Sequence, residues 1–212
     1  YDNLINEGKR KDSIHFVGNT MIDTLMAFES QIELSAILDE FKLEPGKFVL
    51  MTMHRPATVD SRDGLEKLLK LINNVTGKYK LIFPIHPRTT KRLEEFGMLS
   101  DFRNNKQLIL CEPLDYFAFQ KLIRYSKFIL TDSGGIQEES TYRKIPCLTL
   151  RPNTERPVTV DVGTNTLVPF ELDVIEKMVR SIEDGTYKKG EIPQKWDGKS
   201  THRIIKILSE FI

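Results

Sequence analysis

The sequence has few cysteines and no long apolar run, and each shortage excludes a class of protein. Its 212 residues include two cysteines, Cys111 and Cys147, which lie far apart in apolar segments and form no metal or redox motif. We expect both to be reduced core residues. No apolar run approaches the roughly 18 residues of a membrane-spanning helix, and the N-terminus shows no signal peptide. These shortages predict a cytoplasmic protein.

The sequence also has almost no net charge. Lys and Arg total 31 and Asp and Glu total 30, so neither the basic field of a nucleic-acid-binding protein nor an acidic tail is present. Hydrophobic content of 40% and charged content of 29% are ordinary for a globular protein. The chain begins with Tyr1, in what resembles the end of a helix, and we expect a fragment or a processed form.

Motifs for metals and common cofactors are missing. The four histidines, His15, His54, His86 and His202, show no ligand spacing and no accompanying cluster of aspartates. The sequence contains no Walker loop and no Gly-x-Gly-x-x-Gly, which disfavours P-loop ATP binding and NAD. It contains no nucleophile elbow and no Cys–His pairing signal. We therefore expect neither a metal nor a bound cofactor.

Continuous apolar runs alternate with amphipathic helical patterns along the chain. The predicted strands are 48–53, 79–85, 108–111, 128–130, 146–150 and 166–168, and the predicted helices include 34–41, 65–75, 175–182 and 200–212. Unbroken apolar strands alternating with helices are typical of a parallel sheet that is covered on both faces. The pattern predicts an α/β fold with one Rossmann-like domain over 1–212, in which 192–212 form a linker and terminal helix.

The segment 128–140 predicts a strand, a tight turn and a helix that opens at Ser133 or Gly134. The residues before the helix are of types that cap helix N-termini. Gly134 and Gly135 have no side chain to keep an anion from the first free N–H groups, which together with the helix dipole favour a phosphate. Glu139, still near the helix start, could accept hydrogen bonds from sugar hydroxyls. A plain capped turn is the alternative.

Polar residues follow most of the predicted strands, where the carboxyl ends of parallel strands meet at one edge. They are His54 and Arg55, His86 and Arg88, Glu112, Asp132, and Arg151 with Arg156. A single histidine at a strand end is more often a structural hydrogen-bonding group. The collection favours a phosphate site, because arginine offers phosphate a two-pronged contact and His54 could donate to the same group.

The segment 112–119 supplies the apolar surface that a nucleotide base needs. It holds three aromatic residues, Tyr116, Phe117 and Phe119. Helical spacing predicts that most of them are core residues. A given one of the three is therefore expected to pack in the core rather than to contact the base.

Together these motifs resemble the C-terminal half of the non-hydrolysing UDP-N-acetylglucosamine 2-epimerases. The most specific pieces are Asp-Ser-Gly-Gly-Ile-Gln-Glu-Glu at 132–139 and Glu-Arg-Pro at 155–157. The other matching pieces are 17–20 with Asp23, 53–55, 83–87, 112–114 with Tyr116 and Phe119, and 162–165. They occur in the family's order and cover nearly the whole chain.

The resemblance implies one half of a GT-B-type enzyme, with two Rossmann-like domains and the active site between them. It implies that UDP-GlcNAc and UDP-ManNAc are interconverted in two steps. UDP is eliminated to leave a 2-acetamidoglucal, and UDP then adds back to this intermediate. It implies no metal or redox cofactor, a homodimer when full length, and a role in cell-surface polysaccharide biosynthesis. The terminal helix then either packs on its own sheet or crosses to the other domain.

The resemblance also assigns roles to individual residues. Ser133, Gly134 and Gly135 correspond to the diphosphate cradle. Glu139 corresponds to the ribose partner, Leu114 and Phe119 to part of the uracil pocket. Arg156 and the catalytic candidate His54 correspond to the groups that face the phosphates and the leaving UDP. His86 and Arg55 are candidates for a second site or a phosphate contact.

The sequence departs from the family in two places. The N-terminal domain, which carries the family's catalytic carboxylates, is missing from this chain, and Glu138 beside Glu139 is a poor substitute for an acid and a base on opposite sugar faces. We therefore expect weak UDP binding without turnover. Many bacterial members have Arg-Glu-Asn after the His-Arg pair, where this chain has Pro56 onward, which puts activation by a second UDP-GlcNAc in doubt.

Two alternatives remain at this point. One is the donor domain of a GT-B glycosyltransferase, against which the Glu-Arg-Pro piece argues. An assay with a UDP-sugar but no acceptor separates the two, because an epimerase needs no acceptor. The other alternative is a non-catalytic UDP-sugar-binding domain.

Overall fold

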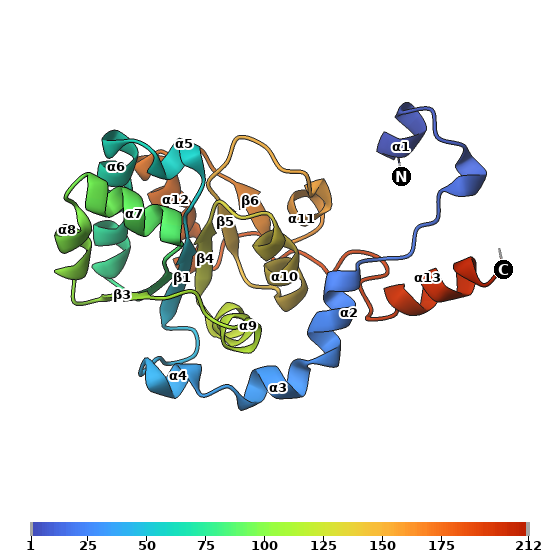
Figure 1. Cartoon of the computed structure of the whole chain (residues 1–212), viewed down its shortest axis with the longest axis horizontal. Coiled ribbons are helices and arrows are strands. Elements are labelled where there is room, and N and C mark those ends of the chain that lie inside the picture. Colours follow the sequence, from blue (N-terminus) through green and yellow to red (C-terminus); the bar gives the residue numbers. More distant parts are fainter. Residues whose placement is uncertain (1, 211–212) are drawn as a thin grey trace. The chain divides into compact units, whose positions relative to one another are not determined.

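The computed structural model describes residues 2–210 and contains a six-stranded, wholly parallel sheet (Figure 1). Its strands are β1 (Phe48–Thr52), β2 (Lys80–Pro84), β3 (Leu108–Cys111), β4 (Phe128–Thr131), β5 (Cys147–Thr149) and β6 (Asn165–Leu167). They lie in the order β3-β2-β1-β4-β5-β6, and each neighbouring pair is parallel. This is the strand order of the Rossmann fold, so the predicted α/β class is confirmed.

Helices lie on both faces of the sheet (Figure 1), and each face carries its own apolar core. Successive strand side chains point to opposite faces, and in β1 Val49 and Met51 enter one core while Phe48 and Leu50 enter the other. The first core is completed by α6 (Arg62–Thr76), α7 (Pro87–Glu95), α8 (Leu99–Arg103) and α12 (Leu172–Glu183). The second is completed by α4 (Ile37–Glu40), α9 (Tyr116–Tyr125) and α10 (Gly135–Arg143).

The chain divides into two compact units, Glu29–Pro193 with the sheet, and Tyr1–Phe28 with Gln194–Ile212. The second unit contains α1 (Asp2–Asn6), the 3₁₀ helix η1 (Lys11–Ser13), α2 (Thr20–Ala27) and α13 (Ser200–Leu208). In this unit the Asp23 carboxylate accepts the backbone N–H groups of Ser200 and Thr201 at 3.0 and 2.6 Å. A carboxylate from α2 therefore satisfies the first free amides of α13.

Most departures from the predicted elements involve short helices. The helix predicted at 34–41 is present as α4 but begins later, because α3 (Glu29–Leu34) ends before it and the Ser35 hydroxyl accepts the Ile37 N–H at 3.4 Å at the break. The sequence also did not indicate the short helices α3, α5 (Pro56–Val59), α8 and α11 (Pro157–Asp161), which are too short to show a clear helical period. The terminal helix ends at Leu208, and the rest of its predicted range, up to Ile212, reaches beyond the described residues.

The structure also bears on the expectations that both cysteines are buried and that no helix spans a membrane. Cys147 is a buried free thiol, as predicted, whereas Cys111 is only half-buried. Burial raises the pKa of both thiols to about 11, so neither is a reactive thiolate near neutral pH. Among residues 2–210, no helix combines the length and the apolar character that crossing a bilayer requires.

Candidate functional site

The sheet has its topological switch point between β1 and β4. From β1 the chain proceeds to β2 and β3 on one side, and from β4 it proceeds to β5 and β6 on the other. Ligands of open α/β sheets bind beyond the carboxyl ends of the strands at such a point. A cavity of about 340 Å³ opens there, lined by residues that follow β1, β2, β3 and β4. The strand order therefore places a cavity where the predicted site residues converge.

The first free amides of α10 lie at this cavity. The helix begins at Gly135 with Gly134 as N-cap. Within the described part of the chain, the amides of Gly134, Gly135 and Ile136 donate to no protein acceptor. These N–H groups, with the positive end of the helix dipole, form an anion-binding arrangement.

Ser133 contributes differently from the prediction. Its backbone N–H donates to Thr131 Oγ1 at 2.9 Å, so this amide of the predicted cradle is already occupied. Ser133 still lines the cavity. The open amides thus begin one residue later than the sequence suggested.

Asp132 joins the two loops that follow β1 and β4. Its side chain is fully buried, and Oδ2 accepts the backbone N–H groups of His54 and Arg55 at 2.9 and 2.8 Å. Its Oδ1 lies 3.1 Å from His54 Nδ1, so the His54 ring has Nε2 on the side away from the carboxylate. Asp132, whose residue type suggested a helix cap, instead orients His54.

The two predicted histidines are brought together. The rings of His54 and His86 stack with centroids 5.3 Å apart and planes inclined by 28°, and both line the cavity. His86 Nδ1 also accepts the Arg88 N–H at 3.1 Å and so caps α7. The stack presents two imidazoles on one wall of the cavity.

The predicted arginines are instead held in contacts with protein groups outside the cavity wall. Arg55 donates from Nε to the Asp132 carbonyl at 3.3 Å. Arg88 pairs with Asp60 at 2.5 Å, and Arg151 pairs with Glu155 at 3.0 Å. None of Arg55, Arg88 and Arg151 lines the cavity, and carboxylates hold the side chains of Arg88 and Arg151.

Arg156 is the arginine that lies beside the α10 N-terminus. Its guanidinium pairs with Glu138 at 2.7 Å and with Glu155 at 2.9 Å. A Cβ at Gly134 would lie 2.8 Å from Arg156 Nη1, so this close approach requires a glycine. A cation thus lies against the open amides.

Glu139 lies on α10 and lines the cavity. It is only 9% exposed, and burial raises its pKa to about 7. A hydrogen bond from Gln120 and the charge of Arg143 oppose that rise, and the charge of Glu138 adds to it. Glu139 therefore changes charge near neutral pH, within a site that also holds two histidines.

The aromatic residues of α9 lie at the cavity more than the sequence suggested. Tyr116 is 38% exposed, Phe117 and Phe119 are half-buried, and the core positions of the helix include Ala118 and Leu122. The prediction that most of the aromatics are core was wrong. Because Asp115 caps α9 at the strand ends by accepting the Ala118 N–H at 2.9 Å, its first turn borders the cavity. Tyr116, Phe119 and Leu114 line it.

A buried polar network, which was not predicted from the sequence, holds the backbone of Ser133 and Arg156 through hydrogen bonds. Gln137 donates from Nε2 to the Ser133 carbonyl at 3.1 Å. Its Oε1 accepts from Thr154 Oγ1 at 2.6 Å and from Asn165 Nδ2 at 3.0 Å. Thr154 Oγ1 in turn accepts the Arg156 N–H at 3.0 Å. No local pattern in the sequence signals contacts between residues so far apart.

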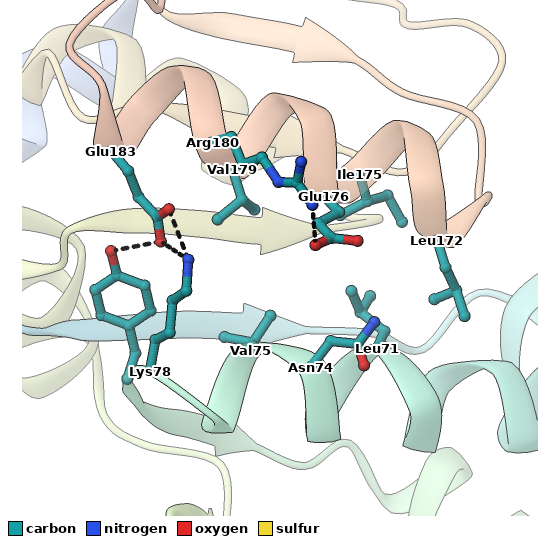
Figure 2. A pocket seen from close by; sticks show the side chains of 11 residues that line it. Leu71, Asn74, Val75, Lys78, Leu172, Ile175, Glu176, Val179, Arg180 and Glu183 are labelled. Atoms are coloured by element: carbon teal, nitrogen blue, oxygen red, sulfur yellow. Dashed lines mark hydrogen bonds and ion pairs between the residues drawn. The ribbon is translucent and has the colours of Figure 1, made fainter.

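A second, smaller cavity lies between α6 and α12 (Figure 2). Apolar side chains such as Val75 and Val179 form its walls, and at one end Glu183 accepts from Lys78 Nζ at 2.9 Å and from the Tyr79 hydroxyl at 3.1 Å. Its volume is about 60 Å³, and none of the predicted site residues line it. The cavity at the switch point is therefore the candidate site.

The chain matches the family model of UDP-N-acetylglucosamine 2-epimerase over residues 1–209. It belongs to the UDP-N-acetylglucosamine 2-epimerase family. The resemblance to this family is thereby confirmed. Of the matching pieces, 53–55, 83–87, 112–114 and 132–139 contribute residues to the cavity at the switch point.

Individual relatives agree with the assignment. The chain is 39% identical over 215 residues to UDP-N-acetylglucosamine 2-epimerase of Methanocaldococcus jannaschii, in an alignment that covers 98% of this chain and 58% of that protein. It is 31% identical to the Bacillus subtilis enzyme, with coverages of 98% and 54%. The chain thus spans a little over half the length of these relatives.

Solved structures of family members have the same fold. The crystal structure of the M. jannaschii UDP-GlcNAc 2-epimerase in complex with UDP-GlcNAc and UDP superposes with a TM-score of 0.84 at 37% identity, covering 99% of this chain and 58% of that one. The Neisseria meningitidis UDP-GlcNAc 2-epimerase bound to UDP-GlcNAc gives a TM-score of 0.83 at 29% identity, with coverages of 99% and 58%.

Proposed function

We propose that this chain is the nucleotide-binding half of an enzyme that interconverts UDP-GlcNAc and UDP-ManNAc. The observation that carries the proposal is the set of open amides at Gly134, Gly135 and Ile136, beside Arg156 and at the switch-point cavity. The M. jannaschii relative, whose structure holds UDP-GlcNAc and UDP, supports the choice of ligand.

In this proposal each part of UDP has a partner. The diphosphate binds at the α10 amides and Arg156, which supply N–H donors and a positive charge. The ribose hydroxyls donate to Glu139, and uracil lies against Leu114 and Phe119. Ser133 and the His54–His86 stack border the phosphates. Arg55, which contacts the Asp132 carbonyl, supports the His54 loop.

The chemistry that these groups support is elimination and re-addition of UDP. Breaking the anomeric C–O bond leaves negative charge on the diphosphate, and donors already aimed at that position stabilise it. His54, oriented by Asp132, is the catalytic candidate that faces the leaving oxygen. The same donors retain UDP, so that its return to the sugar needs no second encounter. We propose no metal or redox cofactor.

We infer that the proton transfers at the sugar use groups other than Glu138 and Glu139. Glu138 is held by Arg156 at 2.7 Å, and Glu139 is committed to the ribose in this proposal. We propose that the remainder of the full-length protein supplies the catalytic carboxylates and a second domain, that the whole protein is a homodimer in the cytoplasm, and that this chain alone binds UDP without turnover.

Two measurements test the proposal. Titration with UDP, followed by backbone amide NMR, should shift the signals of Gly134, Gly135 and His54, while Gly185 in the turn after α12 serves as an unaffected reference. Incubation of the chain with UDP-GlcNAc should produce no UDP-ManNAc. Unchanged signals at Gly134 would overturn the binding assignment, and clear turnover would overturn the proposed need for a second half.

A further inference from the structure

Gln120 on α9 is a buried polar residue whose hydrogen-bonding capacity is not fully used within the described protein. It is 1% exposed, and α9 contributes Ala118, Leu122 and Ile123 to the core around it. Its amide oxygen is buried and has no hydrogen-bond partner in the part of the chain that the structure describes. A buried acceptor without a partner destabilises a fold, so an apolar side chain of similar size would serve the packing better.

The other end of the same amide has a specific partner. The Gln120 side chain hydrogen-bonds to Glu139, and both residues line the cavity at the switch point. The further charged or titratable groups that act on Glu139 are Glu138 and Arg143 on its own helix and Tyr116 on α9.

The hydrogen bond from Gln120 favours the ionised form of this carboxylate, although burial outweighs it. Burial favours its protonated form and Glu138 repels its charge, and the opposing hydrogen bond from Gln120 acts more strongly than Arg143 does. The Arg143 guanidinium is already engaged with both oxygens of Glu29, at 2.8 and 2.7 Å.

We propose that Gln120 is a positioning residue for the ribose of the nucleotide, because its amide holds the Glu139 carboxylate as an acceptor for the ribose hydroxyls. This inference rests on the proposed binding of UDP. An ionised carboxylate has about four acceptor positions, enough for Gln120 and for both hydroxyls of a ribose diol. A protonated carboxyl group would donate at one of them. The unpaired Gln120 oxygen then lowers the stability of the fold, while the amide of the same side chain serves binding through its contact with Glu139.

The test uses Gln120→Met, which keeps the length of the side chain and removes both amide atoms. The dissociation constants of UDP and of 2′,3′-dideoxy-UDP, which lacks both ribose hydroxyls, are measured by calorimetry between pH 6 and pH 9. At pH 7 we expect the variant to bind UDP about tenfold more weakly than the wild type. This is the effect expected when a hydrogen bond to a charged group, here the Glu139 carboxylate, is lost. Its affinity for the dideoxy ligand should stay within about twofold of the wild type.

Two further readouts separate positioning from a structural role. As the pH is lowered, Glu139 is protonated and UDP affinity should fall. The pH at which it has fallen by half should be higher in the variant than in the wild type, because Glu139 loses the donor that favours its charged form. The melting temperature should be unchanged or higher, because a buried unpaired oxygen is removed. Gln31→Met, the same change at an exposed site on α3, is the matched control and should change none of these quantities.

The outcomes are distinguishable. If the wild type binds neither ligand, the proposed function itself fails. If the wild type binds UDP, and the ratio of UDP affinity to dideoxy-UDP affinity is the same in the variant as in the wild type, only the proposed role of Gln120 fails. Equal weakening of both ligands together with a lower melting temperature would make Gln120 a structural residue and would also overturn the inference.

Discussion

The buried carboxylate of Asp132 lies 3.1 Å from His54 Nδ1 and accepts the His54 backbone N–H at 2.9 Å. One side chain thus holds the main chain of a residue 78 positions away in sequence and lies against its ring. A carboxylate at Nδ1 orients the imidazole so that its other nitrogen is available to a ligand.

The two replacements Asp132→Ala and Asp132→Asn should therefore destabilise the fold to different degrees. Asp132→Ala leaves the amides of His54 and Arg55 without their acceptor, and we expect a loss of about 3 kcal/mol in unfolding free energy. Asp132→Asn keeps one acceptor oxygen for these amides and should cost about 1 kcal/mol. Urea unfolding measures both, with exposed Asp101→Ala as control. Equal stability of the two variants would contradict this account.

Gly134→Ala tests the close approach of Arg156 to the helix start. The backbone at Gly134 has φ −76°, which alanine adopts without strain, but the new Cβ would lie 2.8 Å from Arg156 Nη1. Because the guanidinium is the end of a flexible side chain, we expect it to move away while stability stays within about 1 kcal/mol.

The displaced guanidinium should weaken UDP binding in this variant about tenfold, measured by calorimetry, since a charge-assisted contact to phosphate is lost. Gly77→Ala is the control, because Gly77 is also right-handed, at φ −61°, and its Cβ would meet only an ordinary contact at 3.4 Å. Unchanged UDP affinity in Gly134→Ala would remove Arg156 from the proposed site.

Glu139 should make the protein less stable as the pH rises. Its pKa is raised from 4.5 to about 7 in the folded state, so its protonated form is favoured by folding. The associated stability is fully present below pH 4.5 and is lost as the pH rises through about 7. Across that window the loss is about 3 kcal/mol.

Glu139→Gln removes this titration and provides the measurement. The variant should match the wild type in unfolding free energy near pH 5 and exceed it at pH 8, when urea unfolding is followed in the absence of nucleotide. A constant difference between the two proteins over this range would show that Glu139 does not titrate with a raised pKa.

The parallel sheet and the site region were predictable because their signals are local. Unbroken apolar runs marked β1 and β4, and Gly134 with Gly135 marked the open helix start. What the sequence could not indicate depends on distant pairings. The adjacency of β1 and β4, which creates the switch point, and the Asp132–His54 contact have no local pattern. Arg88 and Arg151 do not line the cavity, because carboxylates that fold next to them, such as Asp60 beside Arg88, cannot be found from motif spacing.

Asn165 provides a final test, because it links the β6 start to the loop that carries Arg156. It accepts from Thr149 Oγ1 at 2.6 Å and donates to Gln137 Oε1 at 3.0 Å and to Thr159 Oγ1 at 3.1 Å. Asn165→Leu leaves two buried hydroxyls without this partner, and we expect unfolding free energy to fall by about 3 kcal/mol. Exposed Asn74→Leu on α6 should leave it within about 0.5 kcal/mol.

The same variant should weaken UDP binding even at temperatures where it is fully folded. Thr159 Oγ1 donates to the Arg156 carbonyl at 2.8 Å, and Thr154, which Gln137 holds, accepts the Arg156 N–H at 3.0 Å. Loosening Asn165 therefore releases the Arg156 backbone from both sides. Calorimetry at 10 °C should show weaker UDP binding in Asn165→Leu and none of this loss in Asn74→Leu. Wild-type affinity in a destabilised Asn165→Leu protein would show that the network supports the fold without positioning Arg156.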